Sequence, residues 1–132
     1  MEHHKPYESQ RNQPEDFKVS YEFLKTELGI FIQKPFQGMR CDFAYEGDDI
    51  KEVGIYMIWP EFENDDGEII TDKEQDISEV GIARMWILVP EMRELIHKAK
   101  AKVGTKGYFM VGGKKIANAE IIKVVGLHKN TS

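Results

Sequence analysis

The sequence has little of what defines several large classes of protein. It contains a single cysteine, Cys41, which excludes an internal disulfide and a zinc site built from several cysteines. It has no apolar run that approaches the roughly 18–20 residues of a membrane-spanning helix. The first residues lack the apolar stretch of a signal peptide. We therefore expect a cytoplasmic protein.

Charge, in contrast, is abundant and unevenly distributed. The 132 residues include 18 basic and 23 acidic side chains, for a net charge of −5, and 41% are hydrophobic, as in a single globular domain. Residues 61–80 contain one basic and nine acidic side chains, whereas residues 81–132 contain ten basic and three acidic ones. Whether the fold keeps these two stretches apart decides whether the protein has two regions of opposite sign.

Two segments have the spacing of amphipathic helices. In the first, apolar residues recur every three or four positions and predict a helix over 17–28, with Gly29 just past its end. The second opens with Pro90, which suits the first turn of a helix, and an apolar stripe follows it. We therefore predict a second helix over 90–103.

Most of the remaining apolar residues follow strand patterns. Their runs either alternate with polar residues or are nearly continuous, and glycines, prolines or charged turns separate them. Pro60 is expected to end one strand, and the pair Gly112-Gly113 to form a hairpin turn. The predicted strands are 39–45, 53–59, 81–89, 107–111 and 115–125, and a hairpin within the acidic connection 61–79 would add a sixth.

These elements predict a mainly β (α+β) fold, in which five or six strands and two short helices form a small antiparallel β-barrel. The barrel is a single domain over residues 17–129. Residues 1–16 precede it as a polar segment with two prolines, which is typical of a flexible arm.

Two stretches of the chain share a further pattern. In residues 35–45 the pair Pro35-Phe36 precedes a strand that carries Arg40 and Phe43, and in residues 107–122 an aromatic strand and a Gly-Gly-basic turn precede another strand. Both stretches resemble the carboxy-terminal β-barrel of elongation factor Tu, in the same order along the chain. The resemblance implies a six-stranded Greek-key-type barrel. It does not imply a GTPase, because no Gly-x-x-x-x-Gly-Lys-Ser/Thr motif occurs.

The chain departs from that family in its closing hairpin. Met110 and Val111 stand where the family has an arginine, and two alanines stand where it has small glycines. Among the basic positions through which such barrels contact transfer RNA, Arg40 and Lys114 match. Without a nucleotide-binding domain, the resemblance implies a binding or adaptor module.

The reactive side chains do not predict an active site. Cys41 alternates with apolar residues and is expected on the buried face of its strand, where a thiol acts as a small hydrophobe. His97, the one histidine inside a predicted element, is expected at the half-exposed boundary of its helix. We therefore predict no catalytic residue and no enzyme.

Two other motifs look like ligand sites but fail in detail. The run Asn64-Asp65-Asp66-Gly67-Glu68 is similar to a calcium loop, but an EF-hand with Gly67 at its sixth position needs acids where Phe62 and Lys73 stand. The run Gly112-Gly113-Lys114-Lys115 does not open a helix, as a phosphate-binding loop would. We predict no metal site and no cofactor.

The leading functional hypothesis is a non-enzymatic binding or adaptor module that binds another protein. Long connections are often functional, and acidic charge speeds the encounter with a basic surface. An immunity-type protein that binds a basic toxin is one version of this hypothesis. The candidate protein-binding residues are Glu61, Glu63, Asp65, Asp66 and Glu68.

The alternative hypothesis is an RNA-associated, translation-related module. It uses the basic C-terminal part of the chain, although the isoelectric point near 5.4 is lower than nucleic-acid-binding domains usually have. The candidate nucleic-acid-binding residues are Lys98, Lys102, Lys106, Lys114 and Lys115.

Overall fold

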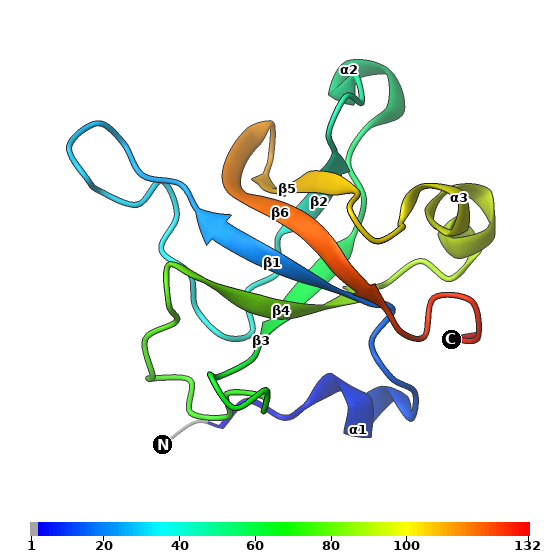
Figure 1. The fold of residues 1–132 in the computed structure, drawn as a ribbon, viewed down its shortest axis with the longest axis horizontal. Coiled ribbons are helices and arrows are strands. Elements are labelled where there is room, and N and C mark those ends of the chain that lie inside the picture. The colour runs from blue at the N-terminus through cyan, green and yellow to red at the C-terminus, as the bar shows by residue number, and fades with distance from the viewer. Residues whose placement is uncertain (1–2) are drawn as a thin grey trace.

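The computed structural model describes residues 3–132 and contains one sheet of six antiparallel strands. The sheet curls strongly into a half-barrel with short helices around it (Figure 1), which confirms the prediction of a small, mainly β domain. The strands are β1 (Phe17–Phe23), β2 (Asp42–Tyr45), β3 (Ile58–Phe62), β4 (Val80–Ile87), β5 (Lys106–Val111) and β6 (Lys114–Val124), in the spatial order β2-β5-β6-β1-β4-β3. The helices are α1 (Tyr7–Arg11), α2 (Ile50–Val53), the π-helical turn η1 (Arg93–His97) and α3 (Lys98–Lys100).

The helix predicted over 17–28 is wrong, because the central strand β1 occupies its first part. Phe17 and Tyr21 have a spacing that suits a helix, but Val19 and Phe23 complete an alternation of period two that buries one face of a strand. β1 pairs with β4 on one side and with β6 on the other. Pairing on both edges outweighs the local helix preference.

Other boundaries differ less from the predictions. The helix predicted over 90–103 is present in a shorter form, as η1 followed directly by α3. Pro60 lies inside β3 instead of ending it. This is possible because β3 is an edge strand, where a residue without an N–H group can face away from the ladder. Among the described residues, no helix has the length and hydropathy needed to cross a membrane.

The N-terminal segment is packed from residue 3 onward, in contrast to the flexible arm predicted over 1–16. Residues 1 and 2 lie outside the described residues. His4, Glu15 and Asp16 are buried, and α1 runs along the lower edge of the half-barrel in the view of Figure 1. The segment is therefore part of the folded domain.

Aromatic rings fill the inside of the half-barrel. The ring centroids of Tyr21 and Phe62 are 5.2 Å apart in an edge-to-face arrangement, a geometry worth about 0.5–1.5 kcal/mol beyond area burial. Cys41 is 2% exposed, which confirms its predicted burial. The fully buried phenylalanines are Phe17, Phe43, Phe62 and Phe109, with Phe23 at 1% exposure.

The two edge strands approach each other where the sheet curls round. Phe43 of β2 and Tyr56, just before β3, exchange two backbone hydrogen bonds of 2.8 Å. The Gln37 side chain lies at the other end of β3, beside its last residue, Phe62. Its amide donates to the carbonyl oxygens of Ile70, at 2.8 Å, and Phe62, at 3.0 Å, and its Oε1 accepts from the Phe62 N–H at 2.9 Å. Gln37 thus satisfies backbone groups on the open edge of β3.

Candidate functional site

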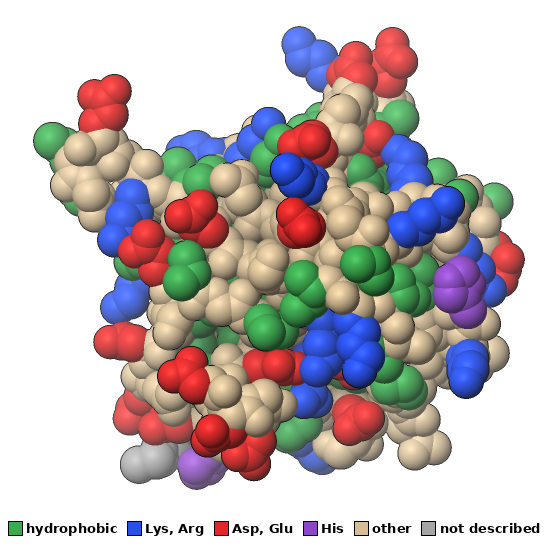
Figure 2. Space-filling model, viewed as in Figure 1, with side chains coloured by type: hydrophobic (Ala, Val, Ile, Leu, Met, Phe, Trp, Pro, Cys, Tyr) green, Lys and Arg blue, Asp and Glu red, His purple; other side chains and the backbone are tan. Residues whose placement is uncertain are grey.

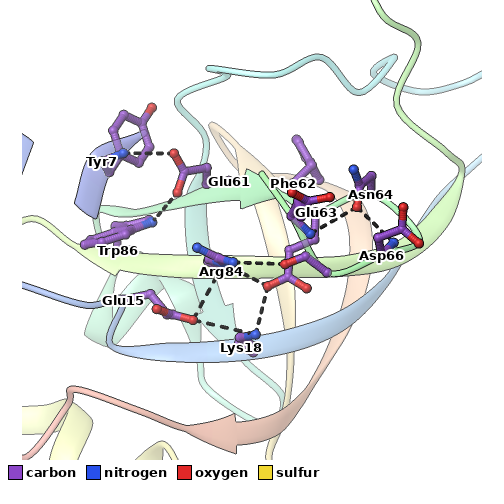
Figure 3. A network of polar contacts seen from close by, with 12 residues as sticks. Tyr7, Glu15, Lys18, Glu61, Phe62, Glu63, Asn64, Asp66, Arg84 and Trp86 are labelled. Carbon is purple, nitrogen blue, oxygen red and sulfur yellow. Dashed lines mark hydrogen bonds and ion pairs between the residues drawn. The ribbon is translucent and has the colours of Figure 1, made fainter. Parts of the chain in front are cut away.

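Three of the five acidic residues predicted to bind a protein lie together in an exposed turn. Asp65, Asp66 and Glu68, which we call the acidic turn, follow β3 in the long connection to β4. The Asn64 side chain organises this turn, because its Oδ1 accepts from the N–H groups of Asp66 at 2.9 Å and Glu68 at 3.0 Å (Figure 3). The backbone of the turn is therefore ordered by Asn64, and its three carboxylates are exposed at the surface.

Glu63 belongs instead to a partly buried charge cluster on the outward face of the sheet (Figure 3). Its Oε2 lies 2.9 Å from Lys18 Nζ and 2.8 Å from Arg84 Nε. Glu15 approaches the same two cations at 3.9 and 3.8 Å. Two acids thus face two bases across β1, β3 and β4, so Glu63 is neutralised within the fold.

Glu61 is fully buried, although it is on the outward face of β3. Its Oε1 accepts from the indole N–H of Trp86 at 3.1 Å, and its Oε2 lies 2.5 Å from His4 Nε2 and 3.0 Å from the Tyr7 backbone nitrogen. Of these five acids, the three of the acidic turn are accessible in this structure, and Glu61 and Glu63 are buried. No local pattern points to the role of His4, because 57 residues separate it from Glu61.

The five candidate lysines are divided between two places. Lys98 forms an ion pair with Glu94 one helical turn earlier, and Lys102 is exposed just beyond α3. The others belong to the hairpin of β5 and β6: Lys106 is exposed where β5 begins, and Lys114 is exposed where β6 begins. Lys115, also in the hairpin, places its ammonium 3.9 Å from the centroid of the Tyr108 ring.

The fold separates the acidic and basic side chains only in part. In Figure 2, acidic side chains gather at the lower left, where Figure 1 shows the connection between β3 and β4. Several basic side chains lie at the right, around α3. The acidic side chains are therefore concentrated at one side of this face, whereas basic side chains also lie over its middle and left, and Lys98 and Lys100 are paired with Glu94 and Asp48.

His97 lies inside the domain, at 1% exposure, and not at the half-exposed boundary predicted for it. Its Nδ1 is 2.7 Å from the Tyr45 hydroxyl, and the Tyr56 ring packs against it edge-on, with centroids 4.8 Å apart. Burial raises the pKa of Tyr45, so this hydroxyl keeps its proton and donates to Nδ1. Burial also lowers the pKa of His97 to about 4, although Asp16 opposes this shift. Both groups are neutral at pH 7.

The burial of neutral His97 predicts a stability that falls in mild acid. The unfolded chain, with a histidine pKa near 6.5, binds this proton before the folded chain does, so the stabilisation is present above pH 6.5 and is lost as the pH falls toward 4. We expect a loss of about 2 kcal/mol between pH 7 and pH 5, measured by urea unfolding. His97→Gln should flatten this part of the profile. Equal pH dependence of the two proteins would contradict the assignment.

The arrangement of reactive groups offers no acid–base or nucleophilic pair among residues 3–132 that we can assign to catalysis. Burial raises the pKa of Cys41 to about 12, so its thiol stays protonated at neutral pH. In the described part of the chain, no group of three or more His, Cys, Asp or Glu residues is placed to hold a metal ion. A hollow of about 400 Å³ on the outer side of β1, β5 and β6 is open and lined by mixed charges such as Glu22, Lys106 and Glu120.

No protein-family model matches the sequence, and no curated protein matches it. The protein is described by its own structure, as a small, mainly β domain with a curled six-stranded antiparallel sheet and an exposed acidic turn.

Proposed function

We propose that this protein is a non-enzymatic, cytoplasmic binding module that docks a basic protein on its acidic turn. The observation that carries this proposal is the turn itself, whose backbone is ordered by Asn64 and which exposes three carboxylates at one side of the domain. An immunity-type role, the binding of a basic toxin, is one form of this function. The charge is suited to recognition because exposed carboxylates lose little hydration before contact and steer a basic partner toward the site.

The fold of the proposed module is a Greek-key barrel of the elongation factor Tu carboxy-terminal type. The two stretches that resemble that family lie side by side in the sheet, which supports this assignment. β2, from the first stretch, pairs with β5, from the second, with Phe43 opposite Phe109. β5 then pairs with β6 through the Gly-Gly turn.

Neutralising the acidic turn is expected to release the partner. The triple change Asp65→Asn, Asp66→Asn and Glu68→Gln removes three charges and keeps the side-chain shapes. Capture of interacting proteins from a cell lysate, read by mass spectrometry, should lose its basic partner with the variant at low salt. It should also lose that partner with the wild type at high salt, because salt screens contacts between exposed charges.

A matched control separates a local effect from one of total charge. Glu22→Gln, Glu52→Gln and Glu91→Gln remove the same charge from exposed positions outside the turn. The control should retain the partner. Retention of every partner by the acidic-turn variant, at both salt concentrations, would rule out this function.

The second candidate is an RNA-associated module, which one observation favours. Tyr108 on β5 lies between Lys106 and Lys115, and basic residues around an aromatic ring are typical of single-stranded nucleic-acid binding. RNA should then co-purify with the wild type at low salt and be lost after Lys106→Gln and Lys115→Gln. That result would favour RNA binding at this surface over protein binding at the acidic turn.

A further inference from the structure

The N-terminal segment lies along the outside of the sheet, beside the edge strand β3. We call residues 3–11 the strap. It is fixed to the connection after β3 by a 2.6 Å hydrogen bond from the His4 N–H to the Thr71 carbonyl, and a β-bridge joins His3 and Asp72. At its other end Arg11 donates to the Ile87 carbonyl at 3.3 Å. The strap is thus an extended peptide followed by one short helix, docked across β3 and β4.

The surface beneath the strap has an unusual composition for the outward face of an edge strand. Glu61 and Trp86 are fully buried there, and Trp59 stands beside them with the Arg40 guanidinium 4.6 Å from its ring centroid. The inward positions of β3 are the apolar Ile58, Pro60 and Phe62. The opposite face thus carries a carboxylate and two indoles, which lie outside the core of the half-barrel.

The sheet itself fixes the orientation of the Glu61 carboxylate. Oε1 accepts the indole N–H of Trp86, a neighbour on β4, at 3.1 Å, and this bond involves no residue of the strap. Oε2 receives both the His4 imidazole and the Tyr7 N–H (Figure 3 shows Tyr7 and Trp86 on the same side of Glu61, each joined to its carboxylate). A pre-oriented acceptor of this kind gives both affinity and register to a bound peptide.

Tyr7 supplies the aromatic anchor of the strap. Its ring packs edge-on against Trp86 with centroids 5.8 Å apart, lies 6.2 Å from Trp59, and meets the His4 ring at 5.0 Å. In contrast, the residues that follow Tyr7 in α1 are exposed as far as Gln10, and the Ser9 and Gln10 side chains bond only within the strap. Two side chains, His4 and Tyr7, therefore carry most of the docking.

We propose that the groove formed by Trp59, Glu61 and Trp86 is a peptide-recognition site, and that the strap is its occupant in the same chain. The ligand is an extended segment of another protein that presents a histidine followed three residues later by a tyrosine. Glu61 Oε2 binds its imidazole and a backbone N–H, and the two tryptophans receive its aromatic ring. The site is separate from the acidic turn and does not depend on the function proposed for it.

A strap in the same chain competes strongly with a separate peptide. A short tether gives the attached segment an effective concentration in the millimolar range, so a micromolar ligand binds only when the strap is weakened. The tether here passes through Asn12, whose φ of 55° is in the left-handed region, and then through Gln13 and Pro14. Strap opening turns about these residues and leaves the six strands intact.

The experiment uses the full chain and a fluorescein-labelled peptide of residues 3–13. The double variant His4→Ala, Tyr7→Ala weakens the strap and is expected to bind the peptide about tenfold or more tightly than the wild type, by fluorescence anisotropy. A peptide with the same two alanines should not bind. Adding Glu61→Gln to the double variant should weaken peptide binding about tenfold. Ser9→Ala, Gln10→Ala is the matched control, which keeps the strap closed and should behave as the wild type.

A second variant keeps the proposal testable if the double variant does not fold. A flexible Gly-Ser insertion between Asn12 and Gln13 preserves every strap contact and lowers its effective concentration, so this protein should bind the peptide more tightly than the wild type. Failure of the folded variants to bind, or equal binding of the alanine peptide, would overturn the proposal. A wild-type dimer that the double variant lacks would make a second copy the occupant and overturn it as stated.

Discussion

Asp16→Ala is expected to lower the free energy of unfolding by about 3–5 kcal/mol, the usual cost of breaking a buried ion pair from one side. Asp16 is fully buried, and its Oδ1 lies 2.7 Å from Arg93 Nε. Its Oδ2 accepts the Ile87 N–H at 2.8 Å, and Asn130 Nδ2 donates to Oδ1 at 3.1 Å. One carboxylate therefore joins β1, β4, η1 and the C-terminal segment, and its loss leaves the Arg93 charge buried without a counterion.

Urea unfolding followed by tryptophan fluorescence measures this loss. Asp76→Ala is the matched control, because the Asp76 side chain is 87% exposed and its 3.5 Å pair with Lys34 is worth little. The double change Asp16→Ala, Arg93→Met should recover part of the stability, since it removes the isolated charge as well. A loss under about 1 kcal/mol for Asp16→Ala would show that this pair does not hold the four elements together.

Phe109→Ala is expected to cost about 3–5 kcal/mol, the typical penalty for deleting a buried phenylalanine ring. Phe109 is fully buried on β5, with its ring centroid 5.8 Å from that of Phe23, 6.2 Å from that of Tyr21 and 6.5 Å from that of Phe43. It therefore joins aromatic residues of β1 and β2, strands that do not pair with each other. Removing the ring leaves a cavity that these rigid aromatic neighbours cannot fill.

Thermal or urea unfolding tests this expectation with two companions. Phe109→Leu keeps most of the volume and should cost under about 1.5 kcal/mol. Tyr108→Ala changes the adjacent, outward-facing residue of the same strand and should cost much less than Phe109→Ala. Similar losses for the two alanine variants would mean that burial within the half-barrel does not govern the stability of β5.

The elements that could be predicted from the sequence are those with local signals. The hairpin of β5 and β6 follows from two apolar runs around a Gly-Gly pair, and the strand around Phe43 from simple alternation. β1 could not be distinguished from a helix by its apolar spacing, because Phe17 and Tyr21 satisfy both periods. Its pairing on both edges, with partners at least 58 residues away, decides that this segment forms a strand.

The candidate site could also be predicted from the sequence only where its signals are local. Asp65, Asp66 and Glu68 are exposed in a turn, as glycine and polar residues between strands indicate. The burial of Glu61 and Glu63 depends on residues remote in the sequence, His4 and Tyr7 for one and Lys18 and Arg84 for the other. Long-range pairs of this kind have no periodic signature.

The open edge of β3 also bears on how the protein behaves at high concentration. An exposed edge strand is a template for strands of other molecules, and so for aggregation. Pro60 has no N–H group to offer such a strand, and Gln37 already occupies the N–H and carbonyl of Phe62. Two side-chain choices therefore protect a sheet that does not close completely from extending into a neighbouring molecule at this edge.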